Sequence, residues 1–311
     1  MDIVFASRHD KHPEEWVRAL QQALPDHSVR LWMEGAASAG TAQAAVVWAP
    51  PQALFEQEPH LRYLFNLGAG VDALLQLPGL PAELSIVRLE DGGMADQMAE
   101  YALYHLLREA RGFGQYADQQ RQARWHRMSP MLREDWPVGI LGSGRIGSRV
   151  AQVFAALDYP VAVWSRQGLP VAGAEVFSGP EGLPAFLART RVLINVLPLT
   201  PATQGILCQD TFEALKPDAF LVNMARGAHL IESDLLAALE SGRLRGAALD
   251  AFIHEPLPAS HPFWAHPRIQ VTPHVAGMSL LGQTVRQIAG KIQALARGEA
   301  ISGVVDRAQQ Y

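Results

Sequence analysis

A glycine-rich turn at residues 142–147 constrains the fold of this 311-residue chain more than any other feature. The segment PVGILGSGRIGSRV spaces Gly142, Gly144 and Gly147 as G-x-G-x-x-G, after a strand-like apolar run and before a helix-like run. The first glycine permits a tight turn, the second lets the backbone approach a pyrophosphate, and the third permits close helix packing. The pattern predicts a dinucleotide-binding unit whose helix N-terminus faces an anion; the competing interpretation is a turn that binds nothing. The predicted loop comprises Gly142, Ser143, Gly144, Arg145, Ile146 and Gly147.

The next apolar run, VAVWS, fits a buried strand, and it ends in Ser165 followed by Arg166. Arg166 lies 24 positions after Gly142 (166 − 142), near the offset of about 20 at which this fold faces the adenosine ribose. An acidic residue there binds the ribose hydroxyls of NAD, whereas a guanidinium binds phosphate oxygens in a bidentate way. We therefore expect NADPH as the preferred cofactor and NADH as the weaker one. The alternative is that Arg166 is only a solvated loop residue.

Strand-like and helix-like runs alternate along the chain, which favours parallel sheets covered by helices. The N-terminal part reads as one small α/β unit, and a long helical pattern at 96–125 leads to a second unit. The last helical run, 280–298, is long enough to return to the first unit. The sequence predicts an α/β protein with two doubly wound parallel-sheet domains. A Rossmann dinucleotide-binding domain (98–278), which binds NADP, is inserted in a flavodoxin-like substrate domain (1–97 plus 279–311).

The composition narrows the classes of partner. A net charge of −5 disfavours nucleic acid, because phosphate contacts need an excess of Lys and Arg. The single cysteine, Cys208, excludes an internal disulfide and disfavours thiolate-bound zinc, so we expect no metal and a reducing compartment. The N-terminal apolar run extends only from Ile3 to Ala6, and no stretch approaches about 20 apolar residues. We expect a cytoplasmic protein with no membrane partner.

Three polar residues follow strand-like runs in the second predicted domain. Arg226 comes after AFLVNMA, Glu255 follows GAALDAF by a few residues, and His274 comes after RIQVTP. Ligands of an open parallel sheet bind beyond the carboxyl ends of its strands. We therefore expect these three side chains to share one rim beside the nicotinamide of a bound cofactor.

These residue types suit the reduction of a 2-keto acid, in which hydride reaches the carbonyl carbon and the oxygen gains charge. His274 can donate the proton because imidazole titrates near neutral pH. Glu255 can hold the histidine in its cationic form, and Arg226 can bind the keto acid and stabilise charge on its oxygen. Each residue alone also has a plain structural interpretation. Their joint position at strand ends is what favours catalysis.

Longer segments extend the pattern over nearly the whole chain. They are LGAGVD, GILGSGRIG, INVLPLTPATQGIL, NMARGAHLIESDLLAALESG, GAALDAFIHEPLP and TPHVAG. On these segments the chain resembles the D-isomer-specific 2-hydroxyacid dehydrogenases. RLEDGGMADQMAEY, the VWSR segment and the ending VVDRAQQY resemble most the members that reduce glyoxylate and hydroxypyruvate.

The resemblance implies a two-domain homodimeric enzyme whose substrate is a small 2-keto acid. It implies that NADPH reduces glyoxylate to glycolate and hydroxypyruvate to D-glycerate, with the three strand-end residues as the active-site set. The dimer contact is expected around residues 96–135, with Trp125 and the adjoining Trp136.

The resemblance also assigns binding residues. LGAGVD would hold the substrate carboxylate on backbone N–H groups near Ala69 and Gly70, as an anion nest. Trp48 and Met94 would narrow the substrate pocket, to which Arg226 also belongs, although both fit a core position equally well. The nicotinamide would lie along Leu197, Pro198 and Thr203, with its carboxamide near Asp250. Ala225 would also belong to the cofactor site.

Two alternatives stay open on the sequence. One is a dehydrogenase for another 2-hydroxy acid, such as 3-phosphoglycerate, which needs extra cations in the substrate domain and commonly a regulatory domain. The chain stops at Tyr311, just after its last helix, which disfavours this choice. The other is a non-catalytic nucleotide sensor with the same fold, which the intact set of Arg226, Glu255 and His274 disfavours.

Overall fold

The first of two units in this computed structural model is built around five parallel strands. Residues 1–8 and 10–309 are described, so the last two residues of the segment VVDRAQQY lie outside the described residues. The units are Met1–Gly93 with Ser279–Tyr311, and Met94–Met278; the sequence placed the first boundary after residue 97. The elements of unit 1 are β1 (Asp2–Ser7), α1 (Pro13–Ala23), β2 (Ser28–Leu31), β3 (Ala44–Trp48), α2 (Ala53–Gln57), β4 (Tyr63–Asn66), α3 (Asp72–Leu75), β5 (Ser85–Val87) and α10 (Leu281–Ala296).

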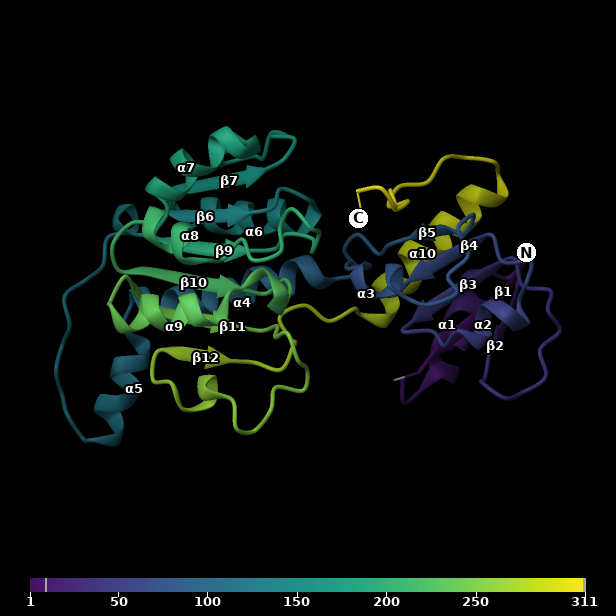
Figure 1. Ribbon diagram of the computed structural model, residues 1–311, viewed down its shortest axis with the longest axis horizontal. Coiled ribbons are helices and arrows are strands. Elements are labelled where there is room, and N and C mark those ends of the chain that lie inside the picture. The colour runs from purple at the N-terminus through teal and green to yellow at the C-terminus, as the bar shows by residue number, and fades with distance from the viewer. Residues whose placement is uncertain (9, 310–311) are drawn as a thin grey trace. The chain divides into compact units, whose positions relative to one another are not determined.

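Unit 2 contains seven strands in one parallel sheet (Figure 1). Its helices and 3₁₀ turns are α4 (Met94–Ala110), α5 (Phe113–Arg121), η1 (Arg133–Asp135), α6 (Arg145–Ala156), α7 (Gly179–Arg189), α8 (Gln209–Ala214), η2 (Gly227–His229), α9 (Glu232–Glu240) and η3 (Pro262–Ala265). Its strands are β6 (Val138–Leu141), β7 (Val161–Ser165), β8 (Glu175–Ser178), β9 (Val192–Asn195), β10 (Ala219–Asn223), β11 (Leu244–Leu249) and β12 (Ile269–Val271).

The order of the strands confirms the predicted fold class. The sheet of unit 1 runs β2-β1-β3-β4-β5, which is the flavodoxin-like order. The sheet of unit 2 runs β12-β11-β10-β9-β6-β7-β8, a doubly wound order whose direction reverses beside β6. Figure 1 shows α8 and α9 on the near face of this sheet and α4 and α6 on the far face.

Continuous apolar runs explain why the central strands are buried on both faces. VGIL in β6, VLIN in β9 and AFLVN in β10 are buried at every position, as expected for a parallel sheet covered by helices. On one face α7, α8 and α9 pack against these strands through Phe186, Phe212 and Leu235. Within the described residues, no helix has the length and apolar character needed to span a membrane.

Each unit closes on itself where the chain passes to the other. In unit 2 the Gln97 side chain donates a 2.8 Å hydrogen bond to the carbonyl of Met278, so the two ends of that unit meet. In unit 1 the amide of Leu280 donates to the carbonyl of Gly92 at 2.9 Å. The inserted segment therefore begins and ends at neighbouring points of its own fold.

The prediction of one long helix over 96–125 is wrong. The helix breaks after Ala110, because Gly112 adopts a left-handed conformation with φ of +64° that a continuous helix cannot contain. α5 then begins at Phe113, and each of its residues is partly or fully exposed. The sequence pattern also missed the short helices α2 and α3.

A buried carboxylate organises the segment between β2 and β3 in unit 1. Glu58, which follows α2, is only 1% exposed and accepts hydrogen bonds from the Ala42 amide (2.9 Å) and the Ser38 hydroxyl. Arg30 donates to the same carboxylate at 2.5 Å. Burial alone would raise the pKa of Glu58, but the hydrogen bonds from Ser38, Ala42 and Arg30 outweigh it, so the pKa lies below its ordinary value.

We expect Glu58→Gln to lower the free energy of unfolding by about 2–4 kcal/mol at pH 7, because it leaves Arg30 and Ser38 with a poorer acceptor. The folded-state pKa is lowered, so the carboxylate stabilises the fold above pH 4.5, its ordinary pKa, and loses this effect as the pH falls further. Urea denaturation at several pH values measures both effects, with the exposed Glu56→Gln as the matched control. A difference between wild type and variant that stays constant down to pH 3 would contradict this role.

Candidate active site

Close backbone packing requires the glycines of the predicted cofactor loop. Gly142 follows β6 with φ of +113°, and its amide donates to the carbonyl of Trp164 at 2.8 Å. A Cβ atom on Gly147 would lie 1.9 Å from the Gly142 carbonyl oxygen, so only glycine fits there. A Cβ on Gly144 would meet no heavy atom of the described residues within 4 Å, apart from its chain neighbours. The loop is therefore closely packed at Gly147 and open at Gly144.

The start of α6 fits a pyrophosphate. Gly144 is the N-cap and has no side chain to cover the amides of the first turn. Ser143 is held from behind, because the Ser148 hydroxyl donates to its carbonyl at 2.9 Å. Arg145 is exposed and Ile146 is half-buried in this first turn. Free amides and the positive end of the helix dipole together favour an anion at this position.

The end of β7 offers a cation beside this loop. The Ser165 hydroxyl is almost fully buried and accepts a 3.1 Å hydrogen bond from the Gly168 amide. Ser165 therefore fixes the turn, while the next side chain, Arg166, is exposed. β7 is the direct neighbour of β6 in the sheet. The turn thus presents a guanidinium where the fold places the adenosine ribose.

Two buried asparagines, which the sequence analysis missed, hold the loops after β9 and β10. Asn195 and Asn223 end these neighbouring strands as register partners, and the Asn195 amide donates to the Asn223 side-chain oxygen at 3.0 Å. The Asn195 oxygen accepts from the Leu197 amide (3.2 Å), and Asn223 donates to the Arg226 carbonyl (3.0 Å). The signal in the sequence was an asparagine at the last position of two apolar strands.

Arg226 lies at the carboxyl end of β10 and is half-buried. Its Nη1 donates to the carbonyl of Ala225 at 2.8 Å. Gly227 follows because a Cβ there would lie 2.0 Å from the carbonyl carbon of Phe252 and 2.2 Å from the amide nitrogen of Ile253. This close approach brings the Arg226 turn against the segment that leads to Glu255.

Glu255 and His274 form a hydrogen-bonded pair, with 2.8 Å between Oε2 and Nδ1. The other carboxylate oxygen, Oε1, accepts from the amide of Phe252 at 2.9 Å, which fixes the carboxylate. The His274 side chain is 43% exposed, so a ligand can reach it. Because Nδ1 faces the carboxylate, Nε2 is the nitrogen that can exchange a proton with a ligand. The pair has the geometry of a general acid with its orienting carboxylate.

A buried carboxylate holds the turn on both sides of His274, whose φ is +56°. Asp250 follows β11 and is 1% exposed. Its Oδ1 accepts from the Thr272 hydroxyl (2.6 Å) and the Val275 amide (2.9 Å), and its Oδ2 accepts from the Ala276 amide (2.8 Å). Asp250 thus anchors the turn that carries the imidazole, a role that the sequence analysis did not predict.

Two neutral side chains on α4 support this turn from the other face of the sheet. The Tyr101 hydroxyl lies 2.7 Å from the Thr272 hydroxyl, and burial raises the pKa of Tyr101. His105 Nδ1 lies 3.0 Å from the Gln270 side-chain oxygen, and burial lowers the pKa of His105 to about 4. Both groups are therefore uncharged at neutral pH.

Other predicted cofactor residues lie on the loop after β9. Leu197 is buried and Pro198 is exposed, and the Thr203 hydroxyl donates to the Pro198 carbonyl at 2.7 Å. Within the described residues, no group of three or more His, Cys, Asp or Glu side chains could hold a metal. Unit 2 carries Arg226, Glu255, His274 and the cofactor loop after four strands of one parallel sheet, and thus on the same edge.

Of the five predicted substrate residues, three belong to unit 1, and Met94 and Arg226 belong to unit 2. Asn66 donates to the carbonyls of Gly68 and Gly70, at 2.9 Å each, and so organises the LGAG turn that contains Ala69. Trp48, at the end of β3, covers Gly68 so closely that a Cβ there would lie 2.5 Å from the ring. Met94 begins α4 and is buried.

The sequence is similar to known proteins over its full length. The family model "D-isomer specific 2-hydroxyacid dehydrogenase, NAD binding domain" matches residues 103–276. Glyoxylate/hydroxypyruvate reductase A of Serratia proteamaculans (strain 568) is 46% identical over 315 residues, covering 98% of each chain. The protein of the same name from Photorhabdus laumondii subsp. laumondii is 44% identical over 315 residues, also covering 98% of each.

Solved structures share the fold. A D-isomer specific 2-hydroxyacid dehydrogenase from Xanthobacter autotrophicus Py2, in complex with NADPH and MES, has a TM-score of 0.93 at 36% identity, covering 100% of this chain and 99% of that one. The NADPH-dependent glyoxylate/hydroxypyruvate reductase of Sinorhizobium meliloti, in complex with NADP and sulfate, has a TM-score of 0.91 at 34% identity, with the same coverage. The chain belongs to the D-isomer specific 2-hydroxyacid dehydrogenase family, which confirms the resemblance seen in the sequence.

Proposed function

We propose that this chain is an NADPH-dependent reductase of small 2-keto acids, which converts glyoxylate to glycolate and hydroxypyruvate to D-glycerate. The observation that carries the proposal is the Glu255–His274 pair, which shares the carboxyl edge of one parallel sheet with Arg226 and the glycine loop. The similarity to the reductases from Serratia and Sinorhizobium supports the substrate and the cofactor.

The cofactor residues belong to unit 2, which we assign as the NADP-binding domain. Bound NADPH supplies the hydride. The loop 142–147 holds the pyrophosphate on its open amides, and Ser165 with Arg166 binds the 2′-phosphate. The nicotinamide end is contacted by Leu197, Pro198, Thr203, Ala225 and Asp250. Because the Asp250 carboxylate already accepts three hydrogen bonds, it has room for only one more donor, such as a carboxamide.

The catalytic roles follow from the geometry of three side chains. His274 donates a proton from Nε2 to the substrate oxygen, while its Nδ1 stays hydrogen-bonded to Glu255. The Glu255 carboxylate, fixed by the Phe252 amide, stabilises the cationic imidazole before transfer. Arg226 binds the keto acid and stabilises the charge that develops on its oxygen.

We assign unit 1 as the substrate domain. The Asn66 side chain fixes the carbonyls of Gly68 and Gly70. The hydrogen bonds found within residues 1–8 and 10–309 do not use the amides of Ala69 and Gly70, which suits an anion nest for a carboxylate. The Ala69 and Gly70 amides supply this contact, and Trp48, rigidly packed on Gly68, limits the size of the acid. Met94 of unit 2 also belongs to the proposed substrate set. We place the enzyme in the cytoplasm, because its single cysteine fits a reducing compartment.

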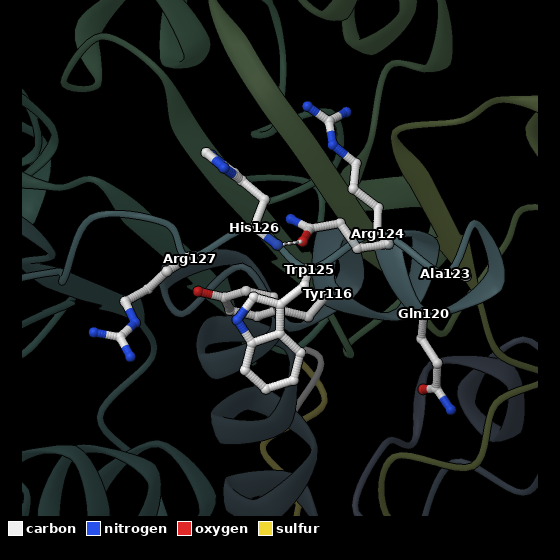
Figure 2. A pocket seen from close by; sticks show the side chains of 8 residues that line it. Tyr116, Gln120, Ala123, Arg124, Trp125, His126 and Arg127 are labelled. Carbon is white, nitrogen blue, oxygen red and sulfur yellow. Dashed lines mark hydrogen bonds between the residues drawn. The ribbon is translucent and has the colours of Figure 1, made fainter.

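The exposed segment around α5 supports a homodimer. Trp125 is 98% exposed, and with Tyr116 it lines a surface cavity of about 570 Å³ that Figure 2 shows from close by. Exposed aromatic side chains are enriched at protein–protein interfaces, which makes this segment a candidate contact. Light scattering should give twice the chain mass of 34.0 kDa. A species of the chain mass at micromolar concentration would contradict the dimer.

Replacing the substrate cation should abolish most turnover. Arg226→Ala is expected to lower kcat with glyoxylate about 10²–10³-fold, the scale for one donor to a developing oxyanion. NADPH oxidation followed at 340 nm measures it, with the exposed Arg268→Ala as the matched control. Near-normal turnover of Arg226→Ala would remove its proposed role. If the wild-type chain binds NADPH but does not oxidise it with any of the 2-keto acids tested, the result would instead indicate a nucleotide sensor.

Reversing the charge at the end of β7 should change the choice of cofactor. Arg166→Asp is expected to raise the KM for NADPH at least about tenfold, because a carboxylate repels the 2′-phosphate, and to leave the KM for NADH nearly unchanged. Steady-state kinetics with both cofactors at saturating glyoxylate provide the measurement. Equal changes in the two KM values would show that Arg166 does not read the phosphate.

A further inference from the structure

We propose that His229 is a positioning residue of the reductase: a buried, neutral imidazole that ties the backbone of Arg226 to the loop that carries Pro198. The inference rests on the proposed function, because that function assigns Arg226 to the keto acid and Pro198 to the nicotinamide. His229 is fully buried at the end of η2, and its ring contacts the backbone of Arg226 and of Pro198.

Both ring nitrogens of His229 face backbone groups of the two loops. Nδ1 lies 3.2 Å from the amide nitrogen of Arg226 and 3.2 Å from its carbonyl oxygen. Nε2 lies 3.3 Å from the carbonyl oxygen of Pro198. One imidazole therefore bridges the residue proposed to bind the keto acid and a residue proposed to contact the nicotinamide.

The partners of the ring select one protonation state. With its hydrogen on Nε2, the ring donates to the Pro198 carbonyl and accepts the Arg226 N–H on Nδ1. The other neutral tautomer would turn a lone pair toward the Pro198 oxygen and an N–H toward the Arg226 N–H. The cation would keep the bond to Pro198 but lose the acceptor for the Arg226 amide. The neutral Nε2–H form alone satisfies both the Arg226 amide and the Pro198 carbonyl. The Arg226 carbonyl, which also lies near Nδ1, needs no hydrogen from the ring, because it accepts from the Asn223 side chain (3.0 Å) and the His229 amide (3.3 Å).

Backbone hydrogen bonds join residues 205–207 to residues 228–231, and the contact between the His229 ring and Pro198 lies at one end of this row. The Gly205 amide donates to the Ala228 carbonyl (2.9 Å), and Leu207 donates to the carbonyl of His229 (2.8 Å). Ile231 then donates back to Leu207 at 3.0 Å. On the N-terminal side of Gly205, the next connection between the two segments is the contact of the His229 ring with the Pro198 carbonyl.

His229 also completes the fixation of Arg226. Asn223 donates to the carbonyl of Arg226, and His229 accepts from its amide, so buried side chains hold both polar groups of this peptide segment. A guanidinium on a fixed backbone needs less ordering when substrate binds. An apolar residue of similar size would fill the space but leave the Arg226 amide without this acceptor.

Three substitutions separate the two halves of the bridge. His229→Asn keeps an acceptor at the place of Nδ1 but loses the donor to Pro198, whereas His229→Gln keeps a donor at the place of Nε2 but loses the acceptor for Arg226. His229→Leu removes both. We expect His229→Leu to lower kcat with glyoxylate about 10–10²-fold, the scale of a small misplacement of a reacting group, and to raise the KM for NADPH about fivefold.

The two conservative variants should each rescue one parameter. His229→Asn should recover kcat to within about threefold of wild type but keep the raised KM for NADPH, and His229→Gln should do the reverse. Thr190→Val is the control, since Thr190 is fully buried in unit 2 and its hydroxyl bonds only the Phe186 carbonyl among the contacts found in the described chain. It should leave both parameters within about twofold.

Nitrogen-15 spectra of the full chain labelled at histidine provide a readout apart from activity. The signals that vanish in His229→Asn should be those of a neutral ring protonated on Nε2 between pH 6 and pH 9. A ring protonated on Nδ1, or variants that change both parameters equally, would overturn the proposal. The proposal would also be overturned if the wild type is active and the His229→Leu variant has the same kcat and the same KM for NADPH. An inactive wild type with the Nε2–H ring would contradict the reductase function while leaving the bridge in place.

Discussion

The buried carboxylate of Asp250 is the interaction on which the active-site edge depends. It accepts from Thr272 before the catalytic turn and from the amides of Val275 and Ala276 after it. The left-handed backbone of His274 costs about 1–2 kcal/mol, and these three charge-assisted hydrogen bonds offset it. The His274 imidazole, on a turn held at both ends, keeps its direction without being buried itself. It can therefore stay open to a ligand and still be rigid.

The same logic governs the neighbouring strands. Parallel strands deliver the ends of β9, β10, β11 and β12 to one edge, so loops far apart in the chain meet without long connections. At that edge the ends of β9, β10 and β11 each carry a polar side chain that faces inward to a loop: Asn195, Asn223 and Asp250. The residues that would touch a ligand are held by residues that would not. This second layer explains how four loops can keep one geometry.

The sequence identified the residues proposed to react more readily than the residues that hold their loops in place. Glycine spacing and the position of Arg226, Glu255 and His274 after apolar strands identified the fold and the edge, because period and strand ends are local signals. Asn195 and His229 carry no such signal, since an inward hydrogen bond depends on which strands become neighbours in three dimensions. The one wrong helix failed for a local reason that the pattern understated, the left-handed Gly112. Helical periodicity on both sides of a single glycine does not reveal whether the glycine breaks the helix.

The closure of unit 2 at Gln97 and Met278 has a consequence for how such a chain can arise. A stretch of polypeptide whose entry and exit adjoin can be exchanged as a block, because the host fold has to bridge only a short gap where it is removed. The host here has that short gap as well, between Gly92 and Leu280. Recombination could therefore combine one nucleotide-binding unit 2 with different versions of unit 1. Each unit would bring its own complete sheet to the hybrid.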